Sequence, residues 1–327
     1  MMHTPLSRTP VSRTPVSRTL LVAITAAAAA TALTSCSDSK GEASATAPRQ
    51  VTVADVTIAQ DKALHDALPE SIRTAGTVRV ATDVPYAPFE MFVAEGKQEL
   101  TGLDYDLGQA LGAKLGVRFA FTPQKFDGIV PAIQAGKFDA AMSAMTDNKE
   151  RQAVVDFVDY SQSGSAVMVV KGNPEKVATL DDLCGKKVAV QAATNQLELL
   201  NGHQEACKKA GRPGIDVQSF PKDSDAQLAL RSGKVVAQVQ TKPAAGWTAK
   251  TADGGNTFEV VDDPAAQGGY GASPNGIAVS KKLPQLTDAI QKALQALIDD
   301  GTVTKIFDKY GVASIAVKEA TKNAEVS

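Results

Sequence analysis

The sequence predicts an α/β protein with a largely parallel sheet, built as two successive units. From residue 77 onward, short runs rich in β-branched residues alternate with longer segments whose apolar residues recur at helical spacing. A breaker cluster, Lys-Gly-Asn-Pro at residues 171–174, interrupts this alternation, which then starts again. The chain has 327 residues, of which 43% are hydrophobic and 21% charged, so it is long and apolar enough for one large or two medium domains.

The first 35 residues predict an export signal. They contain three arginines, no acidic residue and, after the arginines, an apolar run of 14 residues at 20–33. That run is shorter than the roughly 20 residues that a helix needs to cross the hydrocarbon core. It leads into Leu33-Thr34-Ser35-Cys36, which resembles the lipobox of bacterial lipoproteins, although a chance cysteine near a cleavage site is the alternative. We expect Cys36 to carry lipid and residues 36–67 to form a flexible tether and N-terminal extension.

The charge balance bears on possible partners. The formal charge is −2, and it becomes −5 once the three arginines of residues 1–35 leave with the signal. A weakly acidic chain argues against nucleic acid as a partner. We expect a protein on the outer face of the bacterial cell membrane, held there through its lipid alone.

Two further cysteines, Cys184 and Cys207, predict a disulfide. An even pair in an exported chain is more often a disulfide than a redox or metal pair. Cys184 precedes a strand-like run at 188–190, and Cys207 lies late in the helical segment that follows. A strand running out and a helix running back bring the two together, and closing that loop contributes about 3 kcal/mol in the chain-entropy model.

The first unit reads as alternating strands and helices. Within the segment 104–115, for example, Leu107, Leu111 and Leu115 recur at helical spacing. We expect strands at 77–81, 117–121 and 140–142, and helical segments at 104–115, 128–134 and 149–155. In an open sheet of this kind, ligands bind beyond the carboxyl ends of the strands.

The second unit repeats the pattern after a strand at 167–170. A capped turn at 179–183 opens it, and a loose segment at 262–274 closes it. We expect strands at 188–191, 217–220 and 235–239, and helices at 196–210 and 224–231. A strand at 276–279 and two amphipathic helices, at 284–300 and 303–310, complete the chain.

A family resemblance starts at Gly102-Leu103-Asp104-Tyr105-Asp106-Leu107, about 25 residues after the first strand. This motif resembles the signature of the family 3 extracellular solute-binding proteins, the polar amino-acid receptors of bacterial ABC importers. The resemblance continues through further segments and covers about residues 68–310. These segments are 82–90, 128–133, 138–142, 150–151, 155–157, 193–196 and 300–302.

The resemblance implies a two-lobed, type II periplasmic-binding-protein-like fold with two hinge strands. Lobe one would comprise residues 68–165 plus 269–318, lobe two residues 166–268, and the tail residues 319–327. A ligand would bind in the cleft, and the lobes would close over it. The implied function is to capture an amino acid or an amino-acid-like carboxylate for an ABC permease, as a monomer and without a cofactor.

The resemblance also assigns a site for the ligand's α-carboxylate. Arg151 occupies the place of the family's carboxylate-binding arginine, whose guanidinium offers a planar pair of donors. The alternative is a solvated surface arginine. Thr146 and Asn195 match positions whose backbone N–H groups assist, and Thr194 stands beside the second of these at the start of a helix in the other lobe.

The ligand side chain would meet a second group of residues. Tyr86 and Phe126 match the family's sandwiching positions, with core packing as the alternative. Asp83 matches a position that contacts polar or cationic side chains, and its alternative is a turn-forming aspartate. Ser143 and Ala144 complete the expected ligand-binding residues.

One position departs from the family pattern. Thr241 stands where members commonly have an aspartate that pairs with the ligand's α-ammonium, and Val236 replaces a frequent aspartate earlier on that strand. A neutral hydroxyl gives no ion pair. Either Asp83 or carbonyls near Ser143 compensate, or the ligand is not a standard α-amino acid.

An enzyme is the main alternative from another class, because some proteins of this fold resemble exported cyclohexadienyl dehydratases. The chain after residue 35 has only His65 and His203, neither in a motif position, and it lacks hydrolase, zinc and dinucleotide motifs. We therefore expect neither catalytic residues nor a metal site. A surface sensor is the other alternative.

Overall fold

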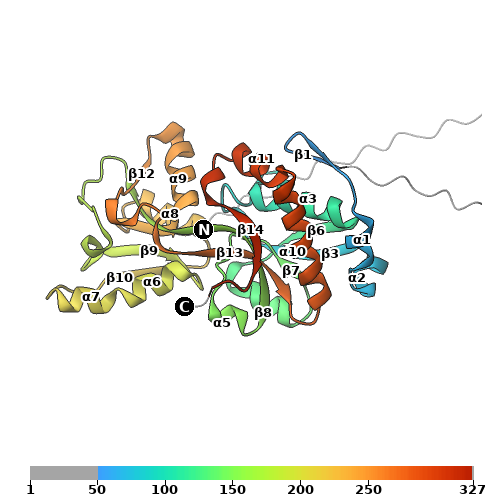
Figure 1. Cartoon of the computed structure of the whole chain (residues 1–327). Coiled ribbons are helices and arrows are strands. Elements are labelled where there is room, and N and C mark those ends of the chain that lie inside the picture. The colour runs from blue at the N-terminus through green and yellow to red at the C-terminus, as the bar shows by residue number, and fades with distance from the viewer. Residues whose placement is uncertain (1–50, 326–327) are drawn as a thin grey trace, which may run out of the picture. The chain divides into compact units, whose positions relative to one another are not determined.

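The computed structural model describes residues 51–325 (Figure 1). The expected export signal, the expected lipidation site Cys36 and the expected tether before residue 51 lie outside the described residues. Among the described strands, ten form one mixed sheet in the order β10-β9-β11-β8-β13-β7-β3-β6, with β12 and β14 also paired to β8. No helix in the described part of the chain combines the length and the apolar character that a membrane crossing requires.

The first lobe places helices on both faces of a sheet whose inner strands are parallel. Strand β3 pairs in parallel with both β6 and β7. The strands are β3 (Thr77–Thr82), β6 (Arg118–Pro123) and β7 (Ala140–Ala141), and the helices are α3 (Leu103–Leu115), α4 (Ile129–Gln134), α5 (Lys149–Gln152), α10 (Pro284–Asp299) and α11 (Thr302–Lys309). Two buried apolar clusters, one on each face of the sheet, form the core of this lobe.

The second lobe repeats this construction with its own two apolar clusters. Strand β9 pairs in parallel with β10 and β11. The strands are β9 (Lys187–Gln191), β10 (Asp216–Phe220), β11 (Ala237–Thr241) and β12 (Phe258–Val260), and the helices are α6 (Asn195–Gly202), α7 (Gln204–Lys209), α8 (Asp223–Arg231) and α9 (Lys242–Thr251).

Two long strands connect the lobes. Strands β8 (Val155–Val170) and β13 (Tyr270–Ser280) pair antiparallel and run side by side from one lobe into the other (Figure 1). Their register shifts twice, between Tyr270 and Ser273 and between Asn275 and Gly276, where irregular pairing bends a ladder. The two hinge strands expected from the family resemblance are therefore present.

Helix α3 shows how the sequence builds the first lobe next to the cleft. Leu103, Leu107, Leu111 and Leu115 are fully buried along one face. Gly102 precedes the helix with φ of 125°, and a Cβ there would lie 2.3 Å from the carbonyl oxygen of Phe89. Only glycine allows this approach, which sets the first turn of α3 against the loop after β3.

Several segments differ from the sequence prediction. The helix expected at 196–210 is divided at His203 into α6 and α7, and the strand expected at 167–170 is the end of the 16-residue β8. Residues 319–322, expected in a tail, belong to β14 (Ala316–Lys322), which pairs with β8. Its charged side chains are typical of an edge strand and therefore resemble a tail in sequence.

The remaining short elements lie before and around α3. Residues of the expected N-terminal extension form a hairpin and a short helix that contact α3, because Val53 and Ile58 join the first lobe's core. These elements are β1 (Val51–Val53), β2 (Val56–Ile58), α1 (Lys62–Asp66), α2 (Glu70–Ala75), β4 (Met91–Phe92) and β5 (Leu100–Thr101).

The expected disulfide is confirmed. Cys184 and Cys207 are bonded, with their Cα atoms 5.5 Å apart and 23 positions apart in the chain. Cys184 follows the short 3₁₀ helix η2 (Leu180–Leu183), and Cys207 lies in α7. The bond therefore ties the entry of the second lobe to one of its outer helices.

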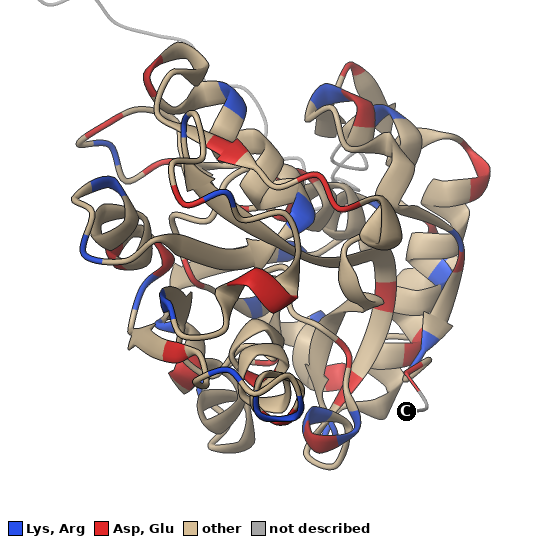
Figure 2. Cartoon of the chain, turned by 90° about the vertical axis from the view of Figure 1, so that its left-hand side faces the viewer, with Lys and Arg blue, Asp and Glu red and all other residues tan. Residues whose placement is uncertain are grey.

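Charged residues of both signs are interspersed along the ribbon of the described chain (Figure 2). Interspersed charges of both signs produce little long-range steering of a charged ligand.

Candidate functional site

A cavity between the two lobes brings together all ten residues that the sequence analysis expected to contact a ligand. We call it the inter-lobe cavity; its volume is about 20 Å³. Its lining consists of Asp83, Tyr86, Glu90, Phe126, Ser143, Ala144, Thr146, Arg151, Gln191, Thr194, Asn195, Gln196 and Thr241. The structure contains no ligand, so the binding roles of these residues stay predictions.

Strand ends explain why residues so distant in sequence meet here. Asp83 follows the last residue of β3, and Ser143 comes two residues after β7. In the other lobe, Gln191 ends β9 and Thr241 ends β11. Carboxyl ends of parallel strands face the same edge of a sheet, and in each lobe that edge faces the cavity.

Arg151 brings a positive charge to the cavity wall. Its guanidinium donates to the carbonyl oxygens of Thr146, at 2.7 Å, and of Ala193, at 2.9 Å, and it lies 5.4 Å from the ring centre of Phe126. No ion pair joins it to a carboxylate of the described residues. Burial lowers the pKa of Arg151, but a guanidinium stays charged at any physiological pH. A half-buried cation without a counter-ion is a suitable site for an anionic group of a ligand.

The opposite wall presents the start of helix α6. Thr194 is the N-cap, and its hydroxyl oxygen accepts a hydrogen bond from the backbone N–H of Leu197. Asn195 is the first helical residue, so its N–H has no partner within the helix. The helix dipole and such N–H groups favour negative charge, as Arg151 does from the other lobe.

Direct hydrogen bonds join the lobes across the cavity. The Tyr86 hydroxyl lies 2.8 Å from Oγ1 of Thr241 and accepts from the backbone N–H of Thr241 at 3.0 Å. Gln191 donates to Asp83 at 2.6 Å. A volume of about 20 Å³ has room for about one water molecule, so an amino acid can enter only when these contacts break and the lobes separate.

Two buried carboxyl groups lie on the first-lobe side of the cavity, which Glu90 lines and Asp104 does not. Oε1 of Glu90 accepts a 2.6 Å hydrogen bond from the Ser143 hydroxyl, and Oε2 is buried and makes no regular hydrogen bond in the described structure. Asp104 accepts from the backbone N–H of Ala144 at 2.8 Å and from the Tyr160 hydroxyl at 2.7 Å.

The pKa values of these two carboxyl groups are both raised, but to different extents. Burial, followed by the charge of Asp104, raises the pKa of Glu90 well above its usual range. Burial also raises the pKa of Asp104, to about 6, although two donors stabilise its charge. Of the two, Glu90 is therefore the group that keeps its proton to the higher pH.

Two further acidic residues surround the Tyr86–Thr241 contact. Burial raises the pKa of Asp83 despite its hydrogen bond from Gln191. Burial also raises the pKa of Asp223, at the start of α8, to about 7, and its charge is close enough to raise the pKa of Tyr86. The cavity is thus lined by acidic residues at Asp83 and Glu90 and by a basic residue at Arg151, with Asp223 outside the lining.

The sequence analysis assigned no role to three of the lining residues. Glu90 ends the motif at 82–90, but as a single acidic residue at the end of a loop it gave no signal of its own. Gln191 and Gln196 gave no sequence signal for a binding role, because glutamines at a strand end and in a helix are ordinary. Gln196 here donates to the Ser165 hydroxyl of hinge strand β8.

The fold and this inter-lobe cavity define a two-lobed solute-binding protein of the type II periplasmic class. The family model for bacterial extracellular solute-binding proteins, family 3, matches residues 78–313. The chain belongs to this family, whose members are extracytoplasmic.

Individual relatives agree with this assignment. The arginine-binding protein ArgT of Corynebacterium glutamicum is 29% identical over 79% of this chain and 82% of its own length. The solved structure of an ancestral arginine-binding protein bound to arginine has a TM-score of 0.63 and 36% identity, over 72% of this chain and 98% of that one. An ancestral amino acid-binding protein, described as a precursor of cyclohexadienyl dehydratase, has a TM-score of 0.62 and 35% identity, over 74% and 98% of the two chains.

Proposed function

We propose that this protein binds a free α-amino acid outside the cytoplasm and delivers it to an ABC permease. The observation that carries the proposal is Arg151, a half-buried guanidinium that hydrogen-bonds only carbonyl oxygens among the described residues and faces the start of α6. An α-carboxylate there would accept from both lobes at once and so favour the closed arrangement. Relatives named for arginine binding support an amino acid as the ligand class.

The acidic side of the cavity would hold the rest of the ligand. Asp83 lies where it can accept from an ammonium group, which compensates for the missing aspartate at Thr241. Glu90 lines the cavity and would contact a polar or cationic side-chain end. Tyr86 and Phe126 would flank the apolar part of that side chain.

Closure would use the hinge strands. We propose lobe one as residues 68–165 plus 269–318 and lobe two as residues 166–268, with β8 and β13 bending between them. The protein would act as a monomer, anchored by lipid at Cys36.

A thermal-shift screen of amino acids, opines and compatible solutes tests this function. A ligand that binds only the folded protein raises its melting temperature. We expect stabilisation by one or a few amino acids with polar or cationic side chains. Stabilisation by sugars or metal ions alone would contradict the proposal.

The substitution Glu90→Gln tests the proposed contact with a cationic side chain. A cationic ligand requires ionised Glu90, whose pKa is raised, so its affinity should rise as the pH rises through that pKa, and binding should release a proton. Glu90→Gln should lower the affinity at high pH about tenfold and flatten the pH dependence, as calorimetry at several pH values would show. The exposed Glu95→Gln serves as the control, and equal pH profiles for wild type and Glu90→Gln would refute the contact.

Mass analysis of the mature protein tests the lipid anchor. After alkylation without reduction we expect no modified cysteine, because Cys184 and Cys207 are bonded and Cys36 carries lipid. One alkylated cysteine would show that Cys36 is free, and two would show that the disulfide is open.

A dehydratase remains the second candidate function. Its basis is Glu90, a carboxyl group that lines the cavity and whose pKa burial and the charge of Asp104 raise well above its usual range, as suits a general acid. Incubation with prephenate and arogenate distinguishes the two functions. We expect no turnover, and turnover would exclude a receptor-only function.

A further inference from the structure

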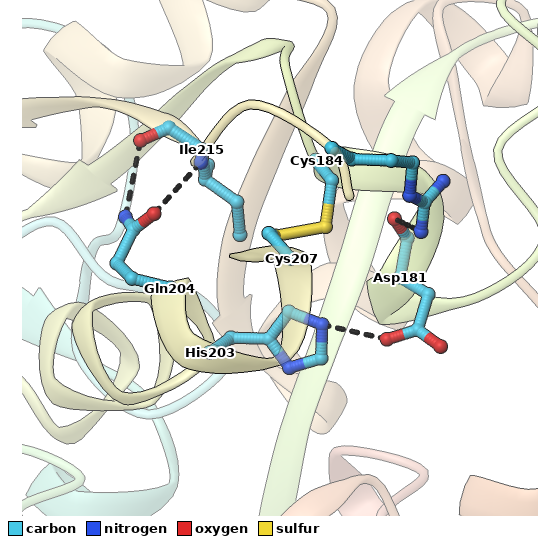
Figure 3. The surroundings of a disulfide bond; sticks show 7 residues. Asp181, Cys184, His203, Gln204, Cys207 and Ile215 are labelled. Atoms are coloured by element: carbon cyan, nitrogen blue, oxygen red, sulfur yellow. Dashed lines mark hydrogen bonds and ion pairs between the residues drawn. A yellow bond between two sulfur atoms is a disulfide. The ribbon is translucent and has the colours of Figure 1, made fainter. Parts of the chain in front are cut away.

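The corner of the second lobe that holds the disulfide also carries a histidine and a carboxylate. Figure 3 shows His203 and Cys207 on one helical segment, facing Cys184 and Asp181 from the neighbouring turn. The backbone N–H of Cys207 donates to the carbonyl of His203, which places the two residues one helical turn apart. Nε2 of His203 lies 2.7 Å from Oδ1 of Asp181. None of these four residues lines the inter-lobe cavity.

The donor atoms of three of these residues are close enough to share one ion, and Asp181 contacts the histidine of that set. One ligand atom each from Cys184, His203 and Cys207 lie within 4.8 Å of one another. In sequence the four residues read Asp-x₂-Cys and His-x₃-Cys, which matches the ligand spacing of structural zinc sites, C-x₂₋₄-C and H-x₃₋₅-H. Compared with those zinc sites, this set has a carboxylate in place of one thiolate and a thiolate in place of one imidazole.

The corner combines enclosure with an entry path. Cys207 is fully buried, and the His203 side chain is 16% exposed, whereas the Asp181 side chain is 66% exposed. An ion bound by two thiolates would therefore be shielded from water and still be reachable from the side of Asp181.

Other contacts hold the ligand-bearing segments in place. The side chain of Gln204 accepts from the backbone N–H of Ile215 at 2.8 Å and donates to its carbonyl oxygen at 3.0 Å. Arg212 donates to the carbonyl oxygen of Asp181, and the backbone N–H of Cys184 donates to the same oxygen at 3.1 Å. These hydrogen bonds do not depend on the disulfide.

We propose that the dithiol form of this corner binds one Zn²⁺, or another thiophilic divalent cation, through Cys184, Cys207, His203 and Asp181. Both cysteines are thiols when the chain is made, so this form precedes the disulfide. Metal binding displaces the two thiol protons and leaves two thiolate ligands. Oxidation instead removes two electrons and two protons and joins the sulfur atoms, so ion and disulfide exclude each other. Return from the disulfide takes two electrons from a dithiol or phosphine reductant.

Cobalt titration tests the site with a spectroscopic signature. The full chain with Cys36→Ser is reduced by a water-soluble phosphine, which becomes the phosphine oxide with oxygen from water. Under anaerobic conditions we expect one equivalent of Co²⁺ to produce thiolate-to-cobalt charge-transfer absorption, and Zn²⁺ to abolish it by displacement. The disulfide form should show no such absorption. Its absence from the reduced chain, or its presence in the disulfide form, overturns the proposal.

Two substitutions separate this site from simple dithiol chelation. His203→Gln and Asp181→Asn should each weaken Zn²⁺ binding about tenfold or more, as measured by competition with a chromophoric chelator. His65→Gln is the matched control, because this histidine lies in the first lobe, where Nδ1 contacts the Leu115 carbonyl oxygen. Unchanged affinity in His203→Gln overturns the proposal.

The melting temperature is a second readout of Zn²⁺ binding, which applies even if the reduced chain is unstable. Zn²⁺ that binds the folded form should raise the melting temperature of the reduced chain and leave that of the reduced His203→Gln variant nearly unchanged. No increase for the reduced chain, or an equal increase for both, contradicts the proposal. Amino-acid binding by the oxidised protein is unaffected by either result.

Discussion

Replacing Arg151 with alanine should weaken amino-acid binding by about a hundredfold or more. Truncating one partner of an enclosed charged pair costs about 2–5 kcal/mol, because the other charge stays buried without its partner. Here the loss would be compounded, since the guanidinium donates to carbonyl oxygens of both lobes, at Thr146 and Ala193. Isothermal titration calorimetry with the ligand found by thermal shift measures the effect.

Two further variants separate charge, geometry and stability. Arg151→Lys keeps the positive charge but loses the planar pair of donors, so its affinity should be intermediate. Arg118→Ala removes an exposed arginine of the first lobe and should leave binding unchanged. Because Arg151 has no carboxylate partner among the described residues, the melting temperature of unliganded Arg151→Ala should change by a few degrees at most. Wild-type affinity in Arg151→Ala would show that the carboxylate is bound elsewhere.

The strand ends explain how much of the site could be predicted. Asp83, Gln191 and Thr241 each lie at or directly after the carboxyl end of a strand. An apolar run followed by a polar residue at such an edge is visible in sequence. The pairing of Asp83 with Gln191 is not visible in the sequence, because it depends on how far the two lobes close. The same holds for Tyr86 and Thr241, whose contact fills space expected for the ligand.

Glu90 illustrates a different limit. In the sequence it is one acidic residue at the end of a loop, and most glutamates are solvated. Its raised pKa arises from burial and from Asp104, which belongs to another segment, so neither cause is visible locally. Strand β14 was missed for a related reason, since the partner that orders its polar residues is the distant β8.

For the hinge strands, the local apolar pattern predicted a strand that is much shorter than the one in the structure. The apolar run at 167–170 predicted a four-residue strand, whereas β8 spans 16 residues. Its middle portion, around Gln162 and Ser163, is polar because it crosses between the lobes and has no single core to face. A strand shared by two cores therefore loses its apolar signature where it passes from one to the other.

Replacing Thr241 with aspartate should weaken binding of the natural ligand about tenfold. Thr241 is buried, and its hydroxyl and backbone N–H both contact the Tyr86 hydroxyl. Asp223 lies close enough to raise the pKa of Tyr86, and its own pKa of about 7 shows how poorly this region holds negative charge. A further carboxylate would be desolvated beside Asp83 and Asp223, and only an ammonium placed at Thr241 could offset that cost.

The direction of the change therefore locates the ligand's ammonium group. If Asp83 binds the ammonium, Thr241→Asp adds repulsion without a new partner, and affinity falls. If the ammonium lies at Thr241, the new charge attracts it across a partly desolvated cleft, where Coulomb interactions are screened less than in water. Thr241→Asn has nearly the same shape without the charge, so the difference between the two variants isolates electrostatics from packing. Tightening of tenfold or more by Thr241→Asp relative to Thr241→Asn would move the ammonium site from Asp83 to Thr241.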